Sequence, residues 1–490
     1  MAALPVPPEL APARPDVMEA LFRPRSVAVI GASARPGFSA ITLRNLVESG
    51  FPGAVYPVNR NHAELAGLTC YPSLESLPGS VDLALVVVPA ARVVTVLEEC
   101  AEAGVRSAIV YSSGFAELGE QGRQAQDRIV TIARQSGMRV LGPNCMGLFY
   151  QPSGLVASFT GSLQGGLLPS SGVAYVGRSG AIGGALLGMA HERGVGLAAW
   201  CSTGNEADLS TAELALALVE QDDVRVLAAY LETVPDGDAW TRLSARVREL
   251  DKHLVVLRSG RSEAGRKAAA SHTGAMVRPD AAFTLVSGDH GVIGVDDIGE
   301  MVEVIDMVLA GRRPAGPDVA VITSSGGAGS ILADLLEGAG LRLAELRPDT
   351  RTALAALIPE YGSAANPVDV TAQLFTQGGG AFEAACLPLL SDTGVGALTV
   401  VLTTVTGELA VTVAEGIVRV SRQTTKPIAV IWIAALAETW EARRILRHAG
   451  IPVTSSMPEH VGLLRNLLTG ARTPARGIRA VAGAAADPPA

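Results

Sequence analysis

Hydrophobic and polar positions alternate between short apolar runs and amphipathic stretches along most of the chain. One version of this pattern occurs three times: an apolar run, a turn rich in glycine and serine, and then a helix-like stretch. The three copies are SVAVIGAS (residues 26–33), GVAYVGRSGAIGGALLGMA (172–190) and DVAVITSSGGAGSILADLL, which begins at Asp318. Apolar, β-branched runs that alternate with helices are typical of parallel sheets covered by helices on both faces. The pattern therefore predicts an α/β protein with three doubly wound domains.

The order of the predicted strands divides the chain into domains. The first copy is followed by four more strand candidates, AVYPVN, DLALVVVP, SAIVYSSGF and MRVLGPN, and five such strands are typical of a Rossmann-like domain. LAAWCS, VLAAYLE and HLVVLRSG predict strands of the second domain, and TVVLTTV and IAVIWIA predict strands of the third. We expect a disordered lead at residues 1–20, domains at 21–155, 165–312 and 316–470, a Gly-, Ser- and Pro-rich link at 151–172, and a tail at 471–490.

The composition changes this picture only by excluding some classes of ligand. The 490 residues include 39 basic and 48 acidic residues, a net charge of −9 without long blocks of like charge, so we expect no nucleic-acid ligand. No apolar stretch reaches the roughly 20 residues of a spanning helix. Five isolated cysteines without CxxC spacing are typical of reduced thiols. These features predict a soluble, cytoplasmic protein that does not enter a membrane.

A single histidine, His272, is the main candidate for covalent chemistry. It lies in LRSGRSEAGRKAAASHTGAMV (257–277), just after the predicted strand LVVL, and its neighbours are small enough to let a charged group approach. A neutral imidazole has one nitrogen free to attack a phosphoryl group, while a carboxylate holds the other. Glu232, at the end of VLAAYLE, is placed to be that carboxylate. The alternatives are a histidine that caps a helix or lines a loop and a solvated glutamate, and no histidine has metal-ligand spacing, so we expect no metal.

The turn at residues 31–33, named here the first turn, has the wrong spacing for a dinucleotide. A nicotinamide site needs G-x-G-x-x-G and an acidic residue after the second strand, but here that strand ends at Asn59 and Arg60. Arginine pairs with phosphate, so Arg60 favours a ligand with extra phosphates, such as coenzyme A. The Gly-rich turn at a helix N-terminus also offers backbone N–H donors to an anion. A turn without a ligand, and an Arg60 that is only a surface charge, remain the alternatives.

Two further turns rich in glycine or serine precede a predicted helix. The second turn contains Arg178, Ser179 and Gly180, and the third turn contains Ser325, Gly326 and Gly327. Both precede helix-like stretches, whose first N–H groups and dipole attract anions. Neither has the lysine of a Walker A loop, and there is no ATP-grasp signature. The chain is therefore predicted to have phosphate-binding turns but no nucleotide-binding domain, and a purely structural role for each turn stays open.

Taken together, SVAVIGAS, AVYPVN, DLALVVVPA, SAIVYSSGFAE, LGPNCMG, RSGAIGG, GRSEAGRKAAASHTGA, TSSGGAG and NPVDVT occur in this order over residues 20–468. In this the chain resembles the α subunits of the NDP-forming acyl-CoA synthetases, which are similar to the succinyl-CoA synthetase α subunit with a third α/β domain. The resemblance implies a Rossmann-like CoA-binding domain followed by two flavodoxin-like ligase domains. It implies that His272 is phosphorylated, that Glu232 supports it, and that Ser179 and Gly180 bind phosphate. It further implies that coenzyme A binds at Gly31, Ala32, Ser33, Asn59, Val88, Pro89, Ser113 and Asn144.

The departures from this family add two expectations. Because no ATP-grasp segment is present, the resemblance implies a separate ATP-grasp β subunit that binds ATP and Mg²⁺, and hence a hetero- or homo-oligomer acting on CoA and a small carboxylic acid. Arg178 stands where acetate-type enzymes often have glutamine and resembles the succinate-type turn. RPD follows residues 275–277, where many relatives have small residues. A CoA-dependent acyl- or amide-forming enzyme and a CoA-sensing protein without activity are the alternative functions.

Overall fold

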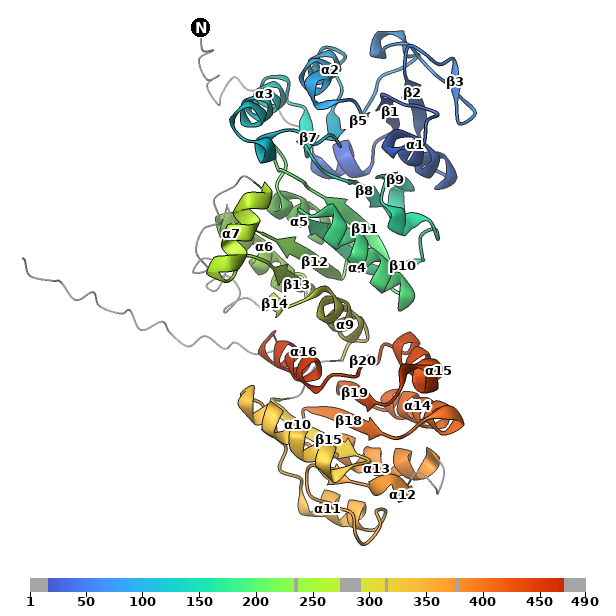
Figure 1. Cartoon of the computed structure of the whole chain (residues 1–490), viewed down its shortest axis with the longest axis vertical. Helices are drawn as coiled ribbons and strands as arrows, with labels where there is room; N and C mark the ends of the chain where they lie inside the picture. Colours follow the sequence, from blue (N-terminus) through green and yellow to red (C-terminus); the bar gives the residue numbers. More distant parts are fainter. Residues whose placement is uncertain (1–15, 233–236, 274–291, 313–315, 375–378, 471–490) are drawn as a thin grey trace, which may run out of the picture.

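The computed structural model describes residues 16–232, 237–273, 292–312, 316–374 and 379–470. Three sheets follow one another along the longest axis of the molecule in the order of the sequence (Figure 1). Each sheet has a set of parallel strands with helices on both faces, and the second sheet adds two antiparallel strands at one edge, so the predicted α/β class with three doubly wound domains is confirmed. Within the described residues, no helix is both long and apolar enough to cross a membrane.

All five strands predicted for the first domain are present and parallel. In spatial order they are β2 (Ala54–Val58), β1 (Ser26–Ile30), β5 (Leu83–Val86), β6 (Ser107–Val110) and β7 (Arg139–Leu141). One face packs α1 (Phe38–Glu48) and η2 (Met18–Phe22), and the other packs α2 (Ala90–Glu102) and α3 (Glu120–Ser136). Short elements complete the domain: β3 (Glu64–Leu65), β4 (Leu68–Thr69), η3 (Leu74–Ser76) and η4 (Ala116–Leu118).

The second sheet has seven strands, and its edge corrects one expectation. The order is β14 (Val292–Val295), β13 (His253–Arg258), β12 (Val226–Leu231), β10 (Ser170–Gly177), β11 (Gly196–Ser202), β8 (Gly147–Tyr150) and β9 (Leu155–Ser158). We expected residues 151–172 to link two domains, but they contain β9, η5 (Gln151–Ser153) and η6 (Gly161–Leu163). β9 pairs antiparallel with β8, and β8 pairs antiparallel with β11. The LVAS of β9 is fully buried, and this burial outweighs the turn-forming residues around it.

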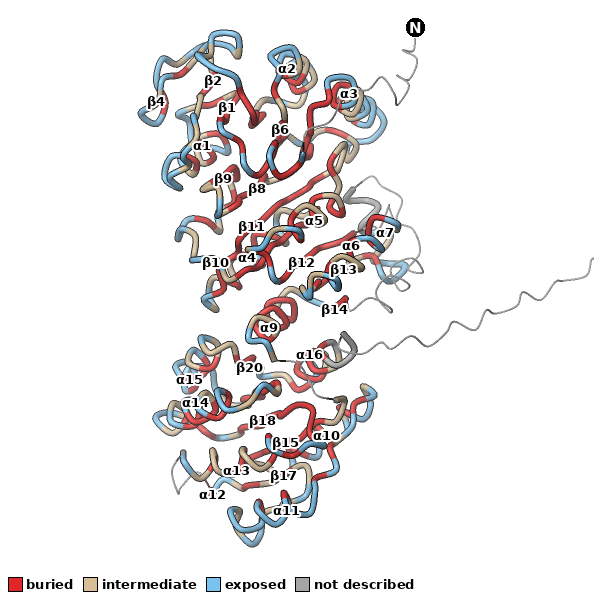
Figure 2. The backbone as a smooth tube through the Cα atoms, turned by 180° about the vertical axis from the view of Figure 1, so that it is seen from behind, coloured by how far each residue is buried: buried red, intermediate tan, exposed pale blue. Residues whose placement is uncertain are grey.

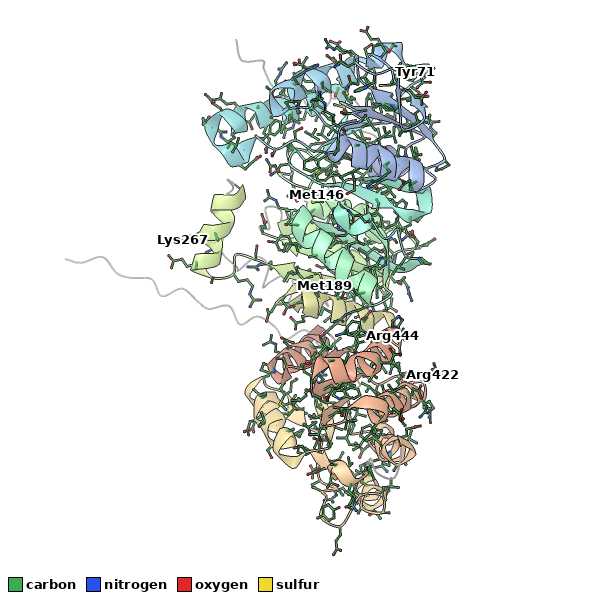
Figure 3. The ribbon with its side chains drawn as sticks, turned by 45° about the vertical axis from the view of Figure 1, so that its right-hand side comes forward. Tyr71, Met146, Met189, Lys267, Arg422 and Arg444 are labelled. Atoms are coloured by element: carbon green, nitrogen blue, oxygen red, sulfur yellow. The ribbon has the colours of Figure 1, made fainter. Side chains whose placement is uncertain are left out.

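The helices of the second domain cover both faces of this sheet. On one face lie α4 (Gly180–Glu192) and α9 (Ile298–Leu309), and on the other lie α5 (Thr211–Val219) and α6 (Gly237–Glu249). α7 (Glu263–Thr273) follows β13, and its residues 263–268 are exposed or half-exposed. It stands outside the packed layers, with Lys267 pointing outward (Figure 3).

The third sheet repeats the parallel arrangement. Its order is β16 (Arg342–Leu343), β15 (Asp318–Thr323), β18 (Ala397–Thr403), β19 (Ile428–Ile433) and β20 (Val453–Thr454), and β17 (Val368–Asp369) pairs with the end of β15. One face packs α10 (Gly326–Gly338) and α16 (Met457–Gly470), and the other packs α13 (Gly379–Ser391), α14 (Gly407–Ser421) and α15 (Leu436–His448). α11 (Pro348–Ala355) and α12 (Thr371–Leu374) complete it.

All three sheets share one strand order. Counting only the parallel strands, and leaving aside the two-residue strand β17 of the third sheet, every sheet runs second, first, third, fourth, fifth. In this order the chain leaves the first and third strands in opposite directions, which opens a crevice at their carboxyl ends where α/β proteins bind ligands. The three turns predicted from the sequence each follow a first strand, β1, β10 or β15, so each lies at such a crevice.

The hydrophobic cores join neighbouring domains. One cluster runs from Leu43 and Leu85 in the first domain to Leu148, Ala174 and Leu214 in the second. α16, at the C-terminal end of the described chain, packs on α9 and β14 of the second domain as well as on α10 of its own. In Figure 2 the strands of the three sheets are mostly buried, and the buried helix α9 lies between the second and third sheets. Burial of this apolar surface fixes the domains relative to one another.

Candidate active site

The first turn lies where β1 and β5 diverge. Gly31 has φ +88°, donates from its backbone N–H to Val58 O at 3.0 Å, and leaves only 2.3 Å between an added Cβ and Val87 O. Only glycine fits such a position, because a side chain meets both backbone strain and a carbonyl. Ala32 is buried, and Ser33 Oγ accepts the N–H of Arg35 at 3.1 Å. The turn is therefore a fixed backbone surface at the crevice.

One expectation about the first turn is wrong. We expected it to open directly onto a helix N-terminus, but α1 begins only at Phe38 and has Gly37 as its N-cap. The N–H groups of the turn are therefore not the first N–H groups of that helix. An anion at this turn has to be held by loop amides and side chains, because the helix dipole acts only within the first turn of a helix.

Asn59 and Arg60 follow β2 and lie beside this turn. The Asn59 side chain donates from Nδ2 to Ala32 O at 2.8 Å and accepts the N–H of Asn61 at 2.9 Å. Asn59 therefore holds the first turn in place. A pocket of about 830 Å³ opens between the carboxyl ends of β1, β2 and β5. Its lining includes Gly31, Asn59, Arg60, Val88, Pro89 and Arg92. The lining also includes the carboxylates of Glu75, Glu99 and Glu102. Within this mixed lining, the two guanidinium groups are the parts that suit the phosphates of a ligand, and glycine at position 31 lets a ligand approach the backbone.

The other two residues expected at the CoA site lie apart from that pocket. Ser113 is exposed after β6, and Asn144 is half-buried after β7 with φ +60°. The backbone N–H of Asn144 donates to Ser112 O at 2.9 Å, so the two loops are joined. The Asn144 side chain donates from Nδ2 to Asn205 Oδ1 of the second domain at 3.3 Å. Asn144 thus contacts the second domain, and Ser113 follows the neighbouring strand at the same carboxyl edge.

The second turn lies at the corresponding crevice of the second sheet. Ser179 is the N-cap of α4, and its Oγ accepts the N–H of Ile182 at 3.3 Å. Arg178 is buried and donates from Nε to Gly204 O at 3.1 Å. A Cβ on Gly180 would lie 2.4 Å from the side chain of Met146, which Figure 3 labels at the boundary of the first two domains. The N-terminal amides of α4 therefore start from a tightly packed turn, and such amides favour an anion.

Glu232 is buried at the carboxyl end of β12, next to β10 and the second turn. The hydroxyl of Tyr230 is the donor toward Ser259 Oγ at 3.1 Å and toward Glu232 Oε1 at 3.4 Å. Burial raises the pKa of Tyr230, so the hydroxyl keeps its proton for these contacts. Tyr230 was missed from the sequence, although its position two residues before Glu232 places both on one face of the strand.

His272 lies near the C-terminal end of α7, and its side chain is outside the described side chains, as are residues 274–277. α7 follows β13, the strand beside β12, and packs against η4 of the first domain. In Figure 1 this helix stands next to the carboxyl edges of both sheets. The helix that carries His272 therefore reaches from the edge with Glu232 toward the loop with Ser113.

The third turn differs from the other two. Ser325 caps α10, accepting the N–H of Ala328 at 3.5 Å, but a Cβ on Gly326 would lie 2.8 Å from Oδ2 of Asp369. Asp369 Oδ1 accepts the N–H of Thr371 at 2.9 Å, which holds the carboxylate in place. The chain thus supplies its own anion to this helix N-terminus, and a second anion is repelled. The placement disfavours phosphate at Ser325, Gly326 and Gly327, and that role stays a prediction without support from the geometry.

The described residues contain no group of three or more His, Cys, Asp and Glu side chains arranged to hold a metal ion. All five cysteines are free and buried. Desolvation raises the pKa of Cys100 and of Cys145 to about 12, so both thiols stay protonated and unreactive. The described cysteines are therefore poor candidates for a nucleophile.

Comparisons with known proteins match each of the three domains. Residues 25–151 match the CoA binding domain, residues 170–308 the succinyl-CoA ligase like flavodoxin domain, and residues 319–467 the Ligase-CoA domain. The α subunit of ADP-forming acetate–CoA ligase I from Pyrococcus furiosus is 39% identical, over 72% of this chain and 76% of that protein. The α subunit of ligase II from the same organism is 33% identical, over 91% and 96%.

A solved structure extends this similarity to three dimensions. It is acetyl-coenzyme A synthetase 1 of Ca. Korarchaeum cryptofilum, described as dinucleotide forming and solved with phosphate and ADP. It superposes with a TM-score of 0.81 at 32% identity, over 93% of this chain and 97% of that chain. Fold and site thus define a ligase-type α/β protein with a CoA-binding domain. The chain belongs to the family of α subunits of ADP-forming acyl-CoA ligases, as the sequence motifs predicted.

Proposed function

We propose that the chain is the α subunit of an acid:CoA ligase that joins a small carboxylic acid to coenzyme A with ATP through a phosphohistidine at His272. One observation carries most of the proposal. The crevice of the second sheet places the buried carboxylate of Glu232 beside the second turn, and the neighbouring strand leads into the helix with His272. A histidine, its supporting carboxylate and an anion-binding turn are the parts that phosphoryl transfer through an imidazole requires.

Each residue has a defined task in this proposal. An imidazole nitrogen of His272 attacks the γ-phosphorus of ATP, forming an N–P bond as ADP leaves. The carboxylate of the acid then takes the phosphoryl group, giving an acyl phosphate and freeing the histidine. Glu232 stabilises the positive charge of the phosphorylated imidazole, and the N–H groups after Ser179 stabilise the phosphoryl oxygens. Bound coenzyme A supplies the thiol that takes the acyl group and releases inorganic phosphate.

The first domain binds coenzyme A in this proposal. The first turn and Asn59 shape the crevice, and Arg60 and Arg92 lie in the pocket where phosphates of the ligand need cations. We further propose that ATP and Mg²⁺ bind to a separate ATP-grasp subunit, so that the working enzyme is a hetero-oligomer in the cytoplasm. Two Pyrococcus furiosus relatives that this chain matches over most of their length are themselves named α subunits, which supports this division.

Mass spectrometry after incubation with ATP, Mg²⁺ and a candidate ATP-grasp subunit tests the proposal. We expect one phosphorylated residue, at His272, and none in His272→Ala, which should also lose acyl-CoA formation while binding coenzyme A within a few-fold. The lone chain should bind coenzyme A but not Mg-ATP. ATP-dependent thioester synthesis by the chain alone, or normal synthesis by His272→Ala, contradicts the proposal.

A further inference from the structure

A loop of the second domain, residues 203–207, lies between the second turn and the loops of the first domain that contain Ser113 and Asn144. The side chain of Asn205 makes the contacts to the first domain. Its Nδ2 donates to Glu117 Oε2 at 2.6 Å and to Gln126 Oε1 at 3.0 Å, and its Oδ1 accepts from Asn144 Nδ2 at 3.3 Å. One carboxamide therefore contacts three side chains across the domain boundary.

The contact with Glu117 continues into the loop after β6. Glu117 Oε1 accepts the backbone N–H of Gly114 at 2.6 Å, directly after Ser113. Burial alone raises the pKa of Glu117, but the hydrogen bonds from Gly114 and Asn205 outweigh it and hold that pKa below its usual value. The carboxylate is thus ionised at neutral pH, and hydrogen bonds to an ionised acceptor are stronger than neutral ones.

On the other side, the same loop is attached to the second turn. Gly204 donates its N–H to Arg178 O at 3.2 Å, and its carbonyl accepts from Arg178 Nε at 3.1 Å. Gly204 has φ +60°, and an added Cβ would lie 2.3 Å from Pro143 O, so the loop is in close contact with the first domain. The backbone N–H of Asn205 also donates to Pro143 O at 2.9 Å. A continuous series of contacts therefore runs from Gly114 through Glu117, Asn205 and Gly204 to Arg178.

The geometry points to Asn205 as a positioning residue that sets the loop with Ser113 relative to the second turn, so that coenzyme A binding to the first domain depends on the second. This inference rests on the proposed function. Asn205 itself touches no reacting group: it acts through Glu117 and Asn144. The contact keeps the thiol end of bound coenzyme A in register with the phosphoryl group at the second turn, because a small displacement of reacting groups costs much of their proximity.

The test replaces the amide donor by a carboxylate and then restores the pair. Asn205→Asp puts two carboxylates face to face, whereas Asn205→Asp with Glu117→Gln restores one donor and one acceptor in the opposite direction. Titration calorimetry of the lone chain with coenzyme A should show about tenfold weaker binding for Asn205→Asp and recovery to within a few-fold in the double variant. Gln135→Glu adds the same charge at an exposed position of α3 and should bind as the wild type does.

A second measurement separates positioning from loss of folding. The yield of phosphohistidine with ATP, Mg²⁺ and the ATP-grasp subunit should be unchanged in Asn205→Asp, because His272, Glu232 and the second turn are intact. If that variant does not fold, Glu117→Gln alone tests the same contact and should weaken coenzyme A binding in the same direction. Unchanged coenzyme A affinity in these variants, or loss that the double variant does not recover, overturns the inference. A wild-type chain that binds no coenzyme A overturns the proposed function itself.

Discussion

Gly31 and Val87 lie so close that a Cβ on Gly31 would be 2.3 Å from the carbonyl oxygen of Val87. β1 and β5 are adjacent and parallel, and Val87 donates its N–H to Ile30 O at 2.9 Å just before the two chains separate. The crevice of the first domain therefore begins at a contact between two backbones. A side chain at Gly31 has to push one of them away.

Gly31→Ala should for this reason weaken coenzyme A binding at least tenfold. The substitution adds strain at φ +88°, on the order of 1–3 kcal/mol, and displaces the floor of the pocket as well. Calorimetric titration with coenzyme A measures the loss. Gly50→Ala is the matched control, because Gly50 also has a left-handed φ, +71°, but its added Cβ has open space. Equal affinity in the two variants would show that the first turn does not contact the ligand.

Glu232→Gln should slow phosphohistidine formation, or speed its decay, by about 10²-fold, the scale of a lost acid–base partner. Glutamine keeps the shape of the buried side chain and its contact with Tyr230 but removes the charge that stabilises the phosphorylated imidazole. Rapid-quench measurement of the phosphoenzyme gives both rates. Glu192→Gln, an exposed change at the end of α4, serves as the control. Unchanged kinetics in Glu232→Gln would leave this residue a structural role only.

Ser179→Ala and Ser325→Ala should separate the second turn from the third. Each removes the hydroxyl that caps a helix, α4 or α10, at a cost of about 1 kcal/mol in stability. Only Ser179→Ala should also slow phosphohistidine formation, by about tenfold, because Asp369 already lies at the N-terminus of α10. Phosphoenzyme rates and unfolding midpoints of both variants make the comparison. If both substitutions slow phosphohistidine formation equally, the third turn also binds phosphate.

His460 gives the third domain a stability that falls in acid. The ring is fully buried with Nε2 2.9 Å from Thr399 Oγ1, and burial lowers its pKa to about 3. Below about pH 6.5 the ring of His460 is protonated in the unfolded chain but stays neutral in the folded chain. The free energy of unfolding therefore decreases as the pH falls. His460→Gln should not show this decrease. Its free energy of unfolding, relative to that of the wild type, should rise by roughly 2 kcal/mol as the pH is lowered from 6.5 to 5. Urea unfolding at both pH values checks it, and parallel curves would contradict it.

Asp306 should give stability the opposite pH dependence. It lies on α9, 3.6 Å from Arg193 and near Glu303 and Arg447, at the boundary of the second and third domains. Burial raises its pKa to about 7, although Arg193 partly opposes the shift. The folded chain therefore holds a proton that the unfolded chain releases, and this stability is lost as the pH rises through 7. The free energy of unfolding of Asp306→Asn, relative to that of the wild type, should rise by on the order of 1–3 kcal/mol from pH 5 to pH 8. Urea unfolding at both pH values measures it.

The fold was predictable because its signals are local. The runs that became β1, β10 and β15 each contain four consecutive apolar residues, VAVI, VAYV and VAVI, and a Gly- or Ser-rich turn follows each one. Glu232 could be placed for the same reason, since a carboxylate that ends a buried strand must lie at the carboxyl edge of the sheet. β9 was not predicted because its four buried residues are surrounded by glycine, serine and proline, whose preference for turns is the stronger signal in the sequence.

The parts that were not predicted depend on contacts between distant segments. Asp369 reaches Gly326 only because β17 pairs with the end of β15. Asn205 meets Glu117 only because the first two domains pack around a shared core. Neither residue differs in type or spacing from an ordinary loop residue. Single-sequence patterns specify elements and their ends, but the pairing of loops from different domains follows from tertiary packing.

The strands β8 and β9 also decide where this protein can be divided. A fragment ending at residue 155 removes β8 from the edge of β11 and breaks the pair of β8 with β9 between two polypeptides. In the remaining C-terminal fragment, β11 becomes an exposed edge strand, and exposed edge strands can pair with other chains. A cut before residue 147 leaves that hairpin whole, yet it still separates Tyr111 and Cys145 from the apolar side chains they share with the second sheet. The first two domains are therefore best produced as a single piece.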